Sequence, residues 1–152
     1  MFQTVEVVVI HDHAPLHLIV KPQRLVLFEM SELALYTMEQ EFQRHFPAIP
    51  LSCNIGDVKD AARVTQLIAA HRPSVVFHAA AYKHVPLMET DNPWQAVRNN
   101  ISGTHVVAKA ALENSVEKFV LISTDKAVNP TNVMGASKRL AELVCQTLQQ
   151  PD

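Results

Sequence analysis

Residues 123–138 read STDKAVNPTNVMGASK, and their position between a strand and a helix decides the fold class of this chain. They follow EKFVLI (117–122), a β-branched and aromatic run that is typical of a buried strand. They lead into RLAELVCQTLQQ (139–150), which has the pattern of an amphipathic helix. Polar side chains therefore gather at the carboxyl end of a strand, which is the edge where open α/β sheets bind ligands.

Strand-like and helix-like windows alternate along the rest of the chain. The predicted strands are residues 5–10, 24–29, 48–53, 74–79 and 118–123. The predicted helices are residues 32–45, 60–71, 92–114 and 137–149, and Ser31 is the expected N-cap of the first. This order predicts an α/β fold, a partial Rossmann-type doubly wound parallel sheet with helices on both faces, in which residues 1–152 form a single domain.

Composition excludes several classes of function. Of 152 residues, 48% are apolar, and the net charge of −2 gives no electrostatic reason to expect binding to nucleic acid or to an anionic membrane. No apolar run approaches the roughly 20 residues of a membrane-spanning helix, so no membrane segment is expected. The N-terminus lacks the pattern of a signal peptide, and two cysteines, Cys53 and Cys145, fit a reducing compartment. The expected location is the cytoplasm.

Two stretches carry a resemblance to a known family. FHAAAYKHVPLME (77–89) and STDKAVNPTNVMGASK together resemble the extended short-chain dehydrogenase/reductase family. Within it, the chain resembles the nucleotide-sugar 4,6-dehydratases of capsule, O-antigen and other lipopolysaccharide synthesis, and the likeness runs from about Pro22 to Gln149. The resemblance implies an NAD-dependent lyase whose substrate is a nucleotide sugar of the UDP-N-acetylglucosamine type. It also allows a homo-oligomer.

The resemblance assigns the elimination chemistry to Asp125 and Lys126. Removing the C5 proton of the sugar and protonating its leaving 6-hydroxyl needs two groups whose pKa values are tuned by their surroundings. Thr124 and Ser123 are expected to hydrogen-bond the sugar or the cofactor, and Lys83 to point toward the sugar. Without the family, the Asp–Lys pair would be interpreted as a surface ion pair of little energetic value.

Met134 stands where most of the superfamily has the tyrosine of a Tyr-x-x-x-Lys motif, and Lys138 is the lysine of that motif. The resemblance implies that this lysine holds the cofactor ribose. A thioether has no proton to exchange, so the group that accepts the 4-hydroxyl proton stays open between Lys138 and a water held by Ser123 or Thr124. The longer, membrane-associated branch of these dehydratases also has methionine at this position.

Further residues are expected to bind NAD by the same resemblance. Glu29 ends a predicted strand, where an acid bonds the adenosine ribose hydroxyls and favours NAD over NADP. Without the family, the alanines at 79–81 would be interpreted as helix packing and Asn100 as a solvated helix residue. The complete set of expected cofactor ligands is Glu29, Asp57, Val58, Ala79, Ala80, Ala81, Asn100, Ser123 and Lys138.

The resemblance is weakest at the start of the chain. The family has a Gly-x-x-Gly-x-x-Gly loop for the cofactor pyrophosphate, but residues 9–20 (VIHDHAPLHLIV) contain no glycine. In the same stretch, His11, His13 and His17 are interpreted as a polar surface loop in preference to a metal site. Residues 1–21 are therefore atypical, and we expect the start of the chain to be a truncated or frame-shifted remnant.

A substrate domain beyond residue 152 is also missing from the expected pattern. Since positioning supplies much of an enzyme's rate acceleration, the sequence predicts a dehydratase fragment with weak or no turnover alone. Two alternatives stay open: a non-catalytic interaction module, and one half of a split enzyme. Exposed apolar patches would favour association with a partner.

Overall fold

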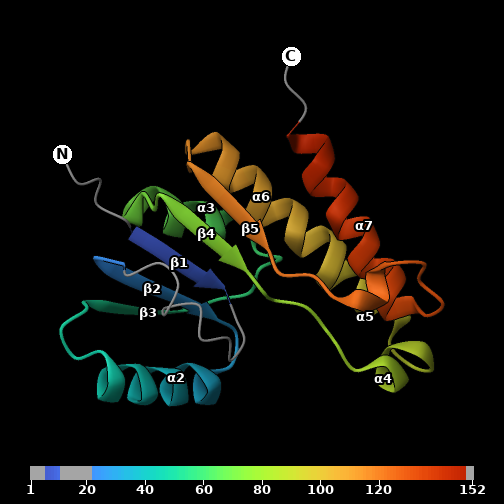
Figure 1. Cartoon of the computed structure of the whole chain (residues 1–152), viewed down its shortest axis with the longest axis horizontal. Coiled ribbons are helices and arrows are strands. Elements are labelled where there is room, and N and C mark those ends of the chain that lie inside the picture. The colour runs from blue at the N-terminus through green and yellow to red at the C-terminus, as the bar shows by residue number, and fades with distance from the viewer. Residues whose placement is uncertain (1–5, 11–21, 150–152) are drawn as a thin grey trace.

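The computed structural model of the chain describes residues 6–10 and 22–149, and of residues 6–10 only the backbone. Within these ranges, five parallel strands form one sheet in the order β3-β2-β1-β4-β5. The strands are β1 (Glu6–Ile10), β2 (Arg24–Glu29), β3 (Leu51–Ile55), β4 (Val75–His78) and β5 (Lys118–Leu121). Figure 1 shows their carboxyl ends pointing the same way. The strand order reverses between β1 and β4, and a reversal of this kind opens a crevice for ligands at the carboxyl edge.

Helices cover both faces of the sheet. The helical elements are α2 (Glu32–His45), α3 (Ala61–His71), α4 (Val85–Glu89), α5 (Pro93–Ala96), the π-helical segment η1 (Val97–Ser102), α6 (Gly103–Glu113), the 3-10 turn η2 (Asp125–Ala127) and α7 (Val133–Leu148). Figure 1 shows α2 on one side of the sheet, α3 and α6 on the other, and α7 beside α6.

Alternation along the strands produces two apolar layers, because successive side chains point to opposite faces. Leu25 and Leu27 of β2 pack with Leu35 and Phe42 of α2. Val26, Phe28 and Val76 face the other way and pack with residues of α3 and α6, namely Val64, Leu67, Ile68, Val107, Ala110 and Ala111. The predicted doubly wound α/β fold is therefore confirmed.

Three predicted elements differ most from the structure, each for a local reason. Strand β3 begins at Leu51 and not at residue 48, because Ile49 closes a turn onto Phe46 and Pro50 has no N–H to donate. The helix predicted over residues 92–114 is divided into α5, η1 and α6 by a π-helical turn. The last helix begins at Val133 and not at Ser137, because the Asn132 side chain accepts the Gly135 N–H at 2.7 Å and caps it.

Candidate functional site

An open pocket lies at the carboxyl ends of β2, β3 and β4. It encloses about 420 Å³ of empty space, counting the part open to solvent. Its lining residues are Phe28, Glu29, Met30, Gly56, Asp57, Val58, Ala80, Ala81, Tyr82 and Asn99. Five of the predicted cofactor ligands therefore surround one cavity, namely Glu29, Asp57, Val58, Ala80 and Ala81. Ala79 is buried just before it along the chain.

Glu29 closes the pocket at the end of β2. Its side chain is buried, and its carboxylate accepts a hydrogen bond from the Ser31 N–H at 2.7 Å. Its carbonyl oxygen accepts the Gly56 N–H at 3.1 Å, which joins the ends of β2 and β3. Gly56 must be glycine here, because a Cβ atom would lie 2.3 Å from the Phe28 ring.

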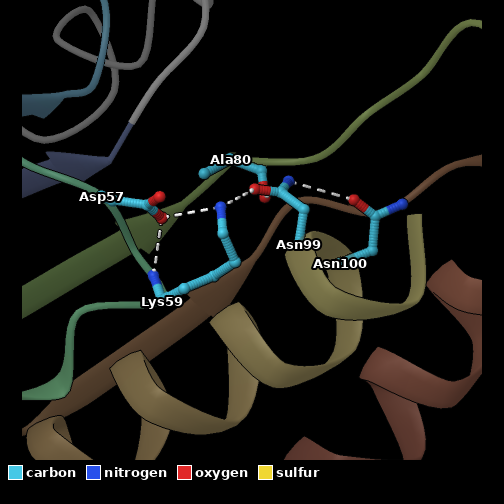
Figure 2. Close-up of polar contacts among 5 residues, drawn as sticks. All are labelled: Asp57, Lys59, Ala80, Asn99 and Asn100. Carbon is cyan, nitrogen blue, oxygen red and sulfur yellow. Dashed lines mark hydrogen bonds and ion pairs between the residues drawn. The ribbon is translucent and has the colours of Figure 1, made fainter. Parts of the chain in front are cut away.

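A second acid, Asp57, is held by a lysine that the sequence did not single out. The Asp57 carboxylate forms an ion pair with Lys59 at 2.8 Å and accepts the Lys59 backbone N–H at 2.9 Å. Burial raises the pKa of the Asp57 carboxyl, but hydrogen bonds from Lys59 and its positive charge outweigh burial and hold that pKa below its ordinary value. Figure 2 shows that the Lys59 side chain also reaches Asn99 of η1. Asp57 is therefore ionised at neutral pH.

Asn100 connects the pocket to helix α7. Its side chain accepts the Tyr82 N–H at 2.8 Å and donates to the Tyr82 carbonyl at 3.2 Å and to the Ser137 hydroxyl at 2.9 Å. Only 1% of Asn100 is exposed, so its interpretation as a solvated helix residue is wrong. The side chain fixes the loop after β4 against the helix that carries Lys138.

Lys138, the residue after Ser137 on α7, is buried. Its ammonium donates to the Ile122 carbonyl at 2.7 Å. Burial, reinforced by the charge of Lys83, lowers the pKa of Lys138 to about 8. A measurable fraction of this amine is therefore neutral near pH 7. The Lys83 side chain is close enough to Lys138 for its charge to affect that pKa.

Met134 lies on the same helix, one turn before Lys138. It is 2% exposed and packs in an apolar cluster with Met88 and Ala96, which Tyr82 borders. Its thioether is thus part of the packing between α4, α5 and α7 and offers no proton to a ligand.

The Asp125–Lys126 pair lies in η2, on the surface of the loop after β5. The two charges are 3.5 Å apart and 88% of the Asp125 side chain is exposed. The Thr124 hydroxyl donates to the Asp125 carboxylate at 3.0 Å, and this bond and the Lys126 charge lower the pKa of Asp125. In the described part of the chain, no hydrogen bond or ion pair joins this pair to Lys138. The loop instead packs on Gly135, where a Cβ atom would lie 2.3 Å from the Lys126 carbonyl oxygen.

Ser123 differs in its surroundings from the other loop residues. Its hydroxyl donates to the Glu142 carboxylate of α7, which also binds Arg139 at 2.8 Å. The structure therefore gives Ser123 a protein partner where the sequence predicted a sugar or cofactor contact.

His78 is a buried group beneath the pocket. Its Nε2 lies 3.0 Å from the Thr104 hydroxyl, which itself donates to the Asn100 carbonyl, so Nε2 is the protonated nitrogen. Its Nδ1 is buried and has no partner among the described residues. Burial, followed by the Lys138 charge, lowers the pKa of His78 to about 3. His78 is thus a neutral histidine that supports η1.

This burial predicts an acid-sensitive stability. An unfolded histidine has a pKa near 6.5, whereas His78 in the folded chain has a pKa of about 3. Between these two pH values the unfolded state binds more protons than the folded state. The stability present above pH 6.5 is therefore lost as the pH falls toward 3. Between pH 7 and pH 5 we expect a loss of about 2 kcal/mol in the free energy of unfolding from this group. Urea unfolding at both pH values measures it. His78→Gln, which keeps a donor for Thr104, should lose less than half as much, and an identical loss would contradict the account.

Two predictions concern residues outside the described part of the chain. They are the surface loop with His11, His13 and His17, and the glycine-free stretch at 9–20, of which the structure describes only the backbone of residues 9 and 10. No helix in the described part of the chain is long and apolar enough to cross a membrane.

Comparison with known proteins gives consistent matches. The profile of a family described as "Polysaccharide biosynthesis protein" matches residues 15–152, so it begins upstream of Pro22. The capsular polysaccharide biosynthesis protein CapD of Staphylococcus aureus is 48% identical over 130 residues, covering 85% of this chain and 22% of CapD. The UDP-N-acetylglucosamine 4,6-dehydratase (inverting) of Campylobacter jejuni is 38% identical over 122 residues, covering 78% of this chain and 33% of that enzyme. The chain thus spans about a fifth to a third of these relatives.

Solved structures agree with the fold. Pen from Bacillus thuringiensis superposes with a TM-score of 0.83 at 31% identity, covering 98% of this chain and 46% of Pen. The Bordetella bronchiseptica enzyme WbmG, solved in complex with NAD, superposes with a TM-score of 0.75 at 19% identity, covering 98% of this chain and 51% of WbmG. At that identity the second match shows the fold alone.

Proposed function

The chain belongs to the polysaccharide biosynthesis protein family, and from this premise we propose that it is the dinucleotide-binding part of an NAD-dependent nucleotide-sugar 4,6-dehydratase. The observation that carries the proposal is the pocket at the strand-order reversal, which brings together five residues expected to bind the cofactor. The names of relatives support the substrate class, since one is a UDP-N-acetylglucosamine 4,6-dehydratase.

The residues of the pocket fit the adenosine half of NAD. Glu29 is a buried acid at the end of β2, suited to accept hydrogen bonds from two ribose hydroxyls. Asp57 is an ionised acceptor on the pocket wall, suited to the amino group of the base. Ala80 and Ala81 have no bulky side chain, so a flat group can approach their backbone. When bound, NAD would supply the oxidation at sugar C4 and the hydride returned at C6.

The proton transfers are assigned to the chain's own residues. The Asp125–Lys126 pair holds a carboxylate and an ammonium side by side, and can therefore accept one proton and donate another during loss of the 6-hydroxyl. Its exposure leaves it accessible to a sugar. Lys138, with a pKa of about 8, is the proposed acceptor of the 4-hydroxyl proton, with a water held by Ser123 or Thr124 as the alternative; Met134 cannot take this role.

Calorimetric titration with NAD tests the proposal. We expect saturable binding at micromolar strength, and at least tenfold weaker binding by Glu29→Gln, because the neutral amide accepts more weakly than a carboxylate. Glu113→Gln, a change on the exposed end of α6, is the control and should bind like the wild type. No binding up to millimolar NAD would contradict the proposal.

Two alternatives stay predictions: a non-catalytic interaction module, and one half of a split enzyme. Leu140 and Leu143 are 48% and 41% exposed and lie three residues apart on α7, so they share a face that a partner or a second copy could cover. Light scattering of the purified chain would measure that association. The cytoplasmic location also stays a prediction.

A further inference from the structure

Lys59 lies at the junction of two segments that are far apart in the sequence. It belongs to the turn after β3, and its side chain, 21% exposed, extends toward η1. Its ammonium is 2.8 Å from Asp57 Oδ1 and 3.4 Å from Asn99 Oδ1. Figure 2 shows the side chain between these two acceptors. One positive charge therefore joins the wall of the pocket to the helical segment beside it.

The acceptor on η1 is itself held in place. Asn99 is 6% exposed, and its amide donates to Asn100 Oδ1 at 3.2 Å and to the Ala80 carbonyl at 3.5 Å. With both amide hydrogens directed there, its oxygen is the atom left to accept from Lys59. The π-helical turn makes this arrangement, since it buries the adjacent Asn99 and Asn100 together. Lys59 is thus bonded to a side chain that is itself buried and hydrogen-bonded.

Anchoring Lys59 orients the Asp57 carboxylate. Oδ1 accepts two hydrogen bonds from one residue, the side-chain ammonium and the backbone N–H of Lys59. Two donors on one oxygen fix the plane of the carboxylate, and Asp57 lines the pocket. Its second oxygen, for which the described residues provide no hydrogen-bond donor, is then the acceptor available to a ligand.

We propose that Lys59 is a positioning residue that directs the second carboxylate oxygen of Asp57 at the base of a bound dinucleotide, and so makes the pocket select a 6-amino purine over a 6-oxo purine. An amino group donates a hydrogen bond to a carboxylate, whereas an oxo group presents a second acceptor to it. A site that bonds a donor discriminates against an analogue that presents an acceptor there, because the carboxylate then loses its partner and faces a second acceptor. The inference rests on the proposed function.

Binding of NAD and of its hypoxanthine analogue tests the proposal. We expect the wild type to bind NAD at least tenfold more tightly than nicotinamide hypoxanthine dinucleotide. Lys59→Met should reduce that ratio below threefold, and Lys59→Arg, which keeps the charge, should restore part of it. Lys109→Met removes a lysine from an exposed ion pair on α6, 3.8 Å from Glu113, and should leave the ratio unchanged.

A measurement without ligand tests the geometry separately. The Asp57 carboxyl, followed by carbon NMR, should have a higher pKa in Lys59→Met, because burial is then opposed only by the backbone N–H at position 59 and the charge of Arg98. An unchanged Asp57 pKa would overturn the positioning role. An unchanged selectivity ratio in a variant that still binds NAD would overturn the inference and leave the proposed function intact. A wild-type chain that binds neither dinucleotide would contradict both.

Discussion

Asn100→Ala is expected to lower the free energy of unfolding by about 3 kcal/mol, because one buried side chain satisfies four polar groups. It bonds both the N–H and the carbonyl of Tyr82, it accepts the Asn99 amide, and it donates to Ser137. A buried polar group left unpaired costs about 1–3 kcal/mol, and both Ser137 and Asn99 are buried. Urea unfolding, followed by circular dichroism, measures the change.

A second asparagine provides the matched control. Asn114 ends α6, and its amide donates to the carbonyl of Ala110 at 2.8 Å within the same helix. Asn114→Ala should therefore lose about 1 kcal/mol, the value of one local hydrogen bond. Asn100→Asp should resemble Asn100→Ala, because a carboxylate keeps the acceptor for Tyr82 and loses both donors. If Asn100→Ala were no more costly than Asn114→Ala, the network would not hold the loop.

Lys138→Met is expected to stabilise the chain at pH 7 while weakening its binding of NAD. A pKa lowered from 10.5 to about 8 means that the folded chain disfavours this charge by on the order of 3 kcal/mol. Methionine fills a similar space, and the lost bond to the Ile122 carbonyl offsets about 1–2 kcal/mol. The net gain in the free energy of unfolding should be about 1–2 kcal/mol.

The pH dependence of that gain has a definite sign. Below pH 8 both states carry the proton, and the full cost of the buried charge is present in the wild type. As pH rises from 8 toward 10.5, the folded amine loses its proton and the cost is relieved, so the advantage of Lys138→Met should shrink. Urea unfolding at pH 7 and pH 9.5 measures it, with the exposed Lys126→Met as control. A loss of stability at pH 7, or a gain that grows with pH, would contradict the account.

Local signals predicted much of the fold. Strand β2 and helix α2 have the predicted bounds, and Ser31 caps α2 by accepting the Ala34 N–H at 3.3 Å. The missed features depend on contacts that periodicity does not record. Helix α4 has five residues with proline near its start, too few to show a period. The sequence of η1 has no feature that distinguishes a π-helical turn from an α-helix. The turn is recognised only in the structure, where Asn99 and Asn100 are both buried.

Some residues of the candidate site could likewise be predicted from the sequence, and others could not. Glu29 could be predicted, because an acid that ends a parallel strand lies at the carboxyl edge, and Asp57 was expected from the family resemblance. Lys59 could not, because its partner Asn99 is 40 positions away in the sequence. The neutral state of His78 also depends on a distant partner, Thr104. A lysine two residues after Asp57 was the one available signal.

The most direct test of the account is an NMR titration of the nitrogen-labelled chain with NAD, because it locates binding as well as detecting it. We expect saturable shifts of the backbone amides at residues 28–30, 56–58 and 80–82, the segments that line the pocket. We also expect smaller shifts at Lys59, which pairs with Asp57, and at Asn99 and Asn100, which bond Lys59 and Tyr82. No shifts up to millimolar NAD, or saturable shifts confined to the outer face of α7, would contradict it.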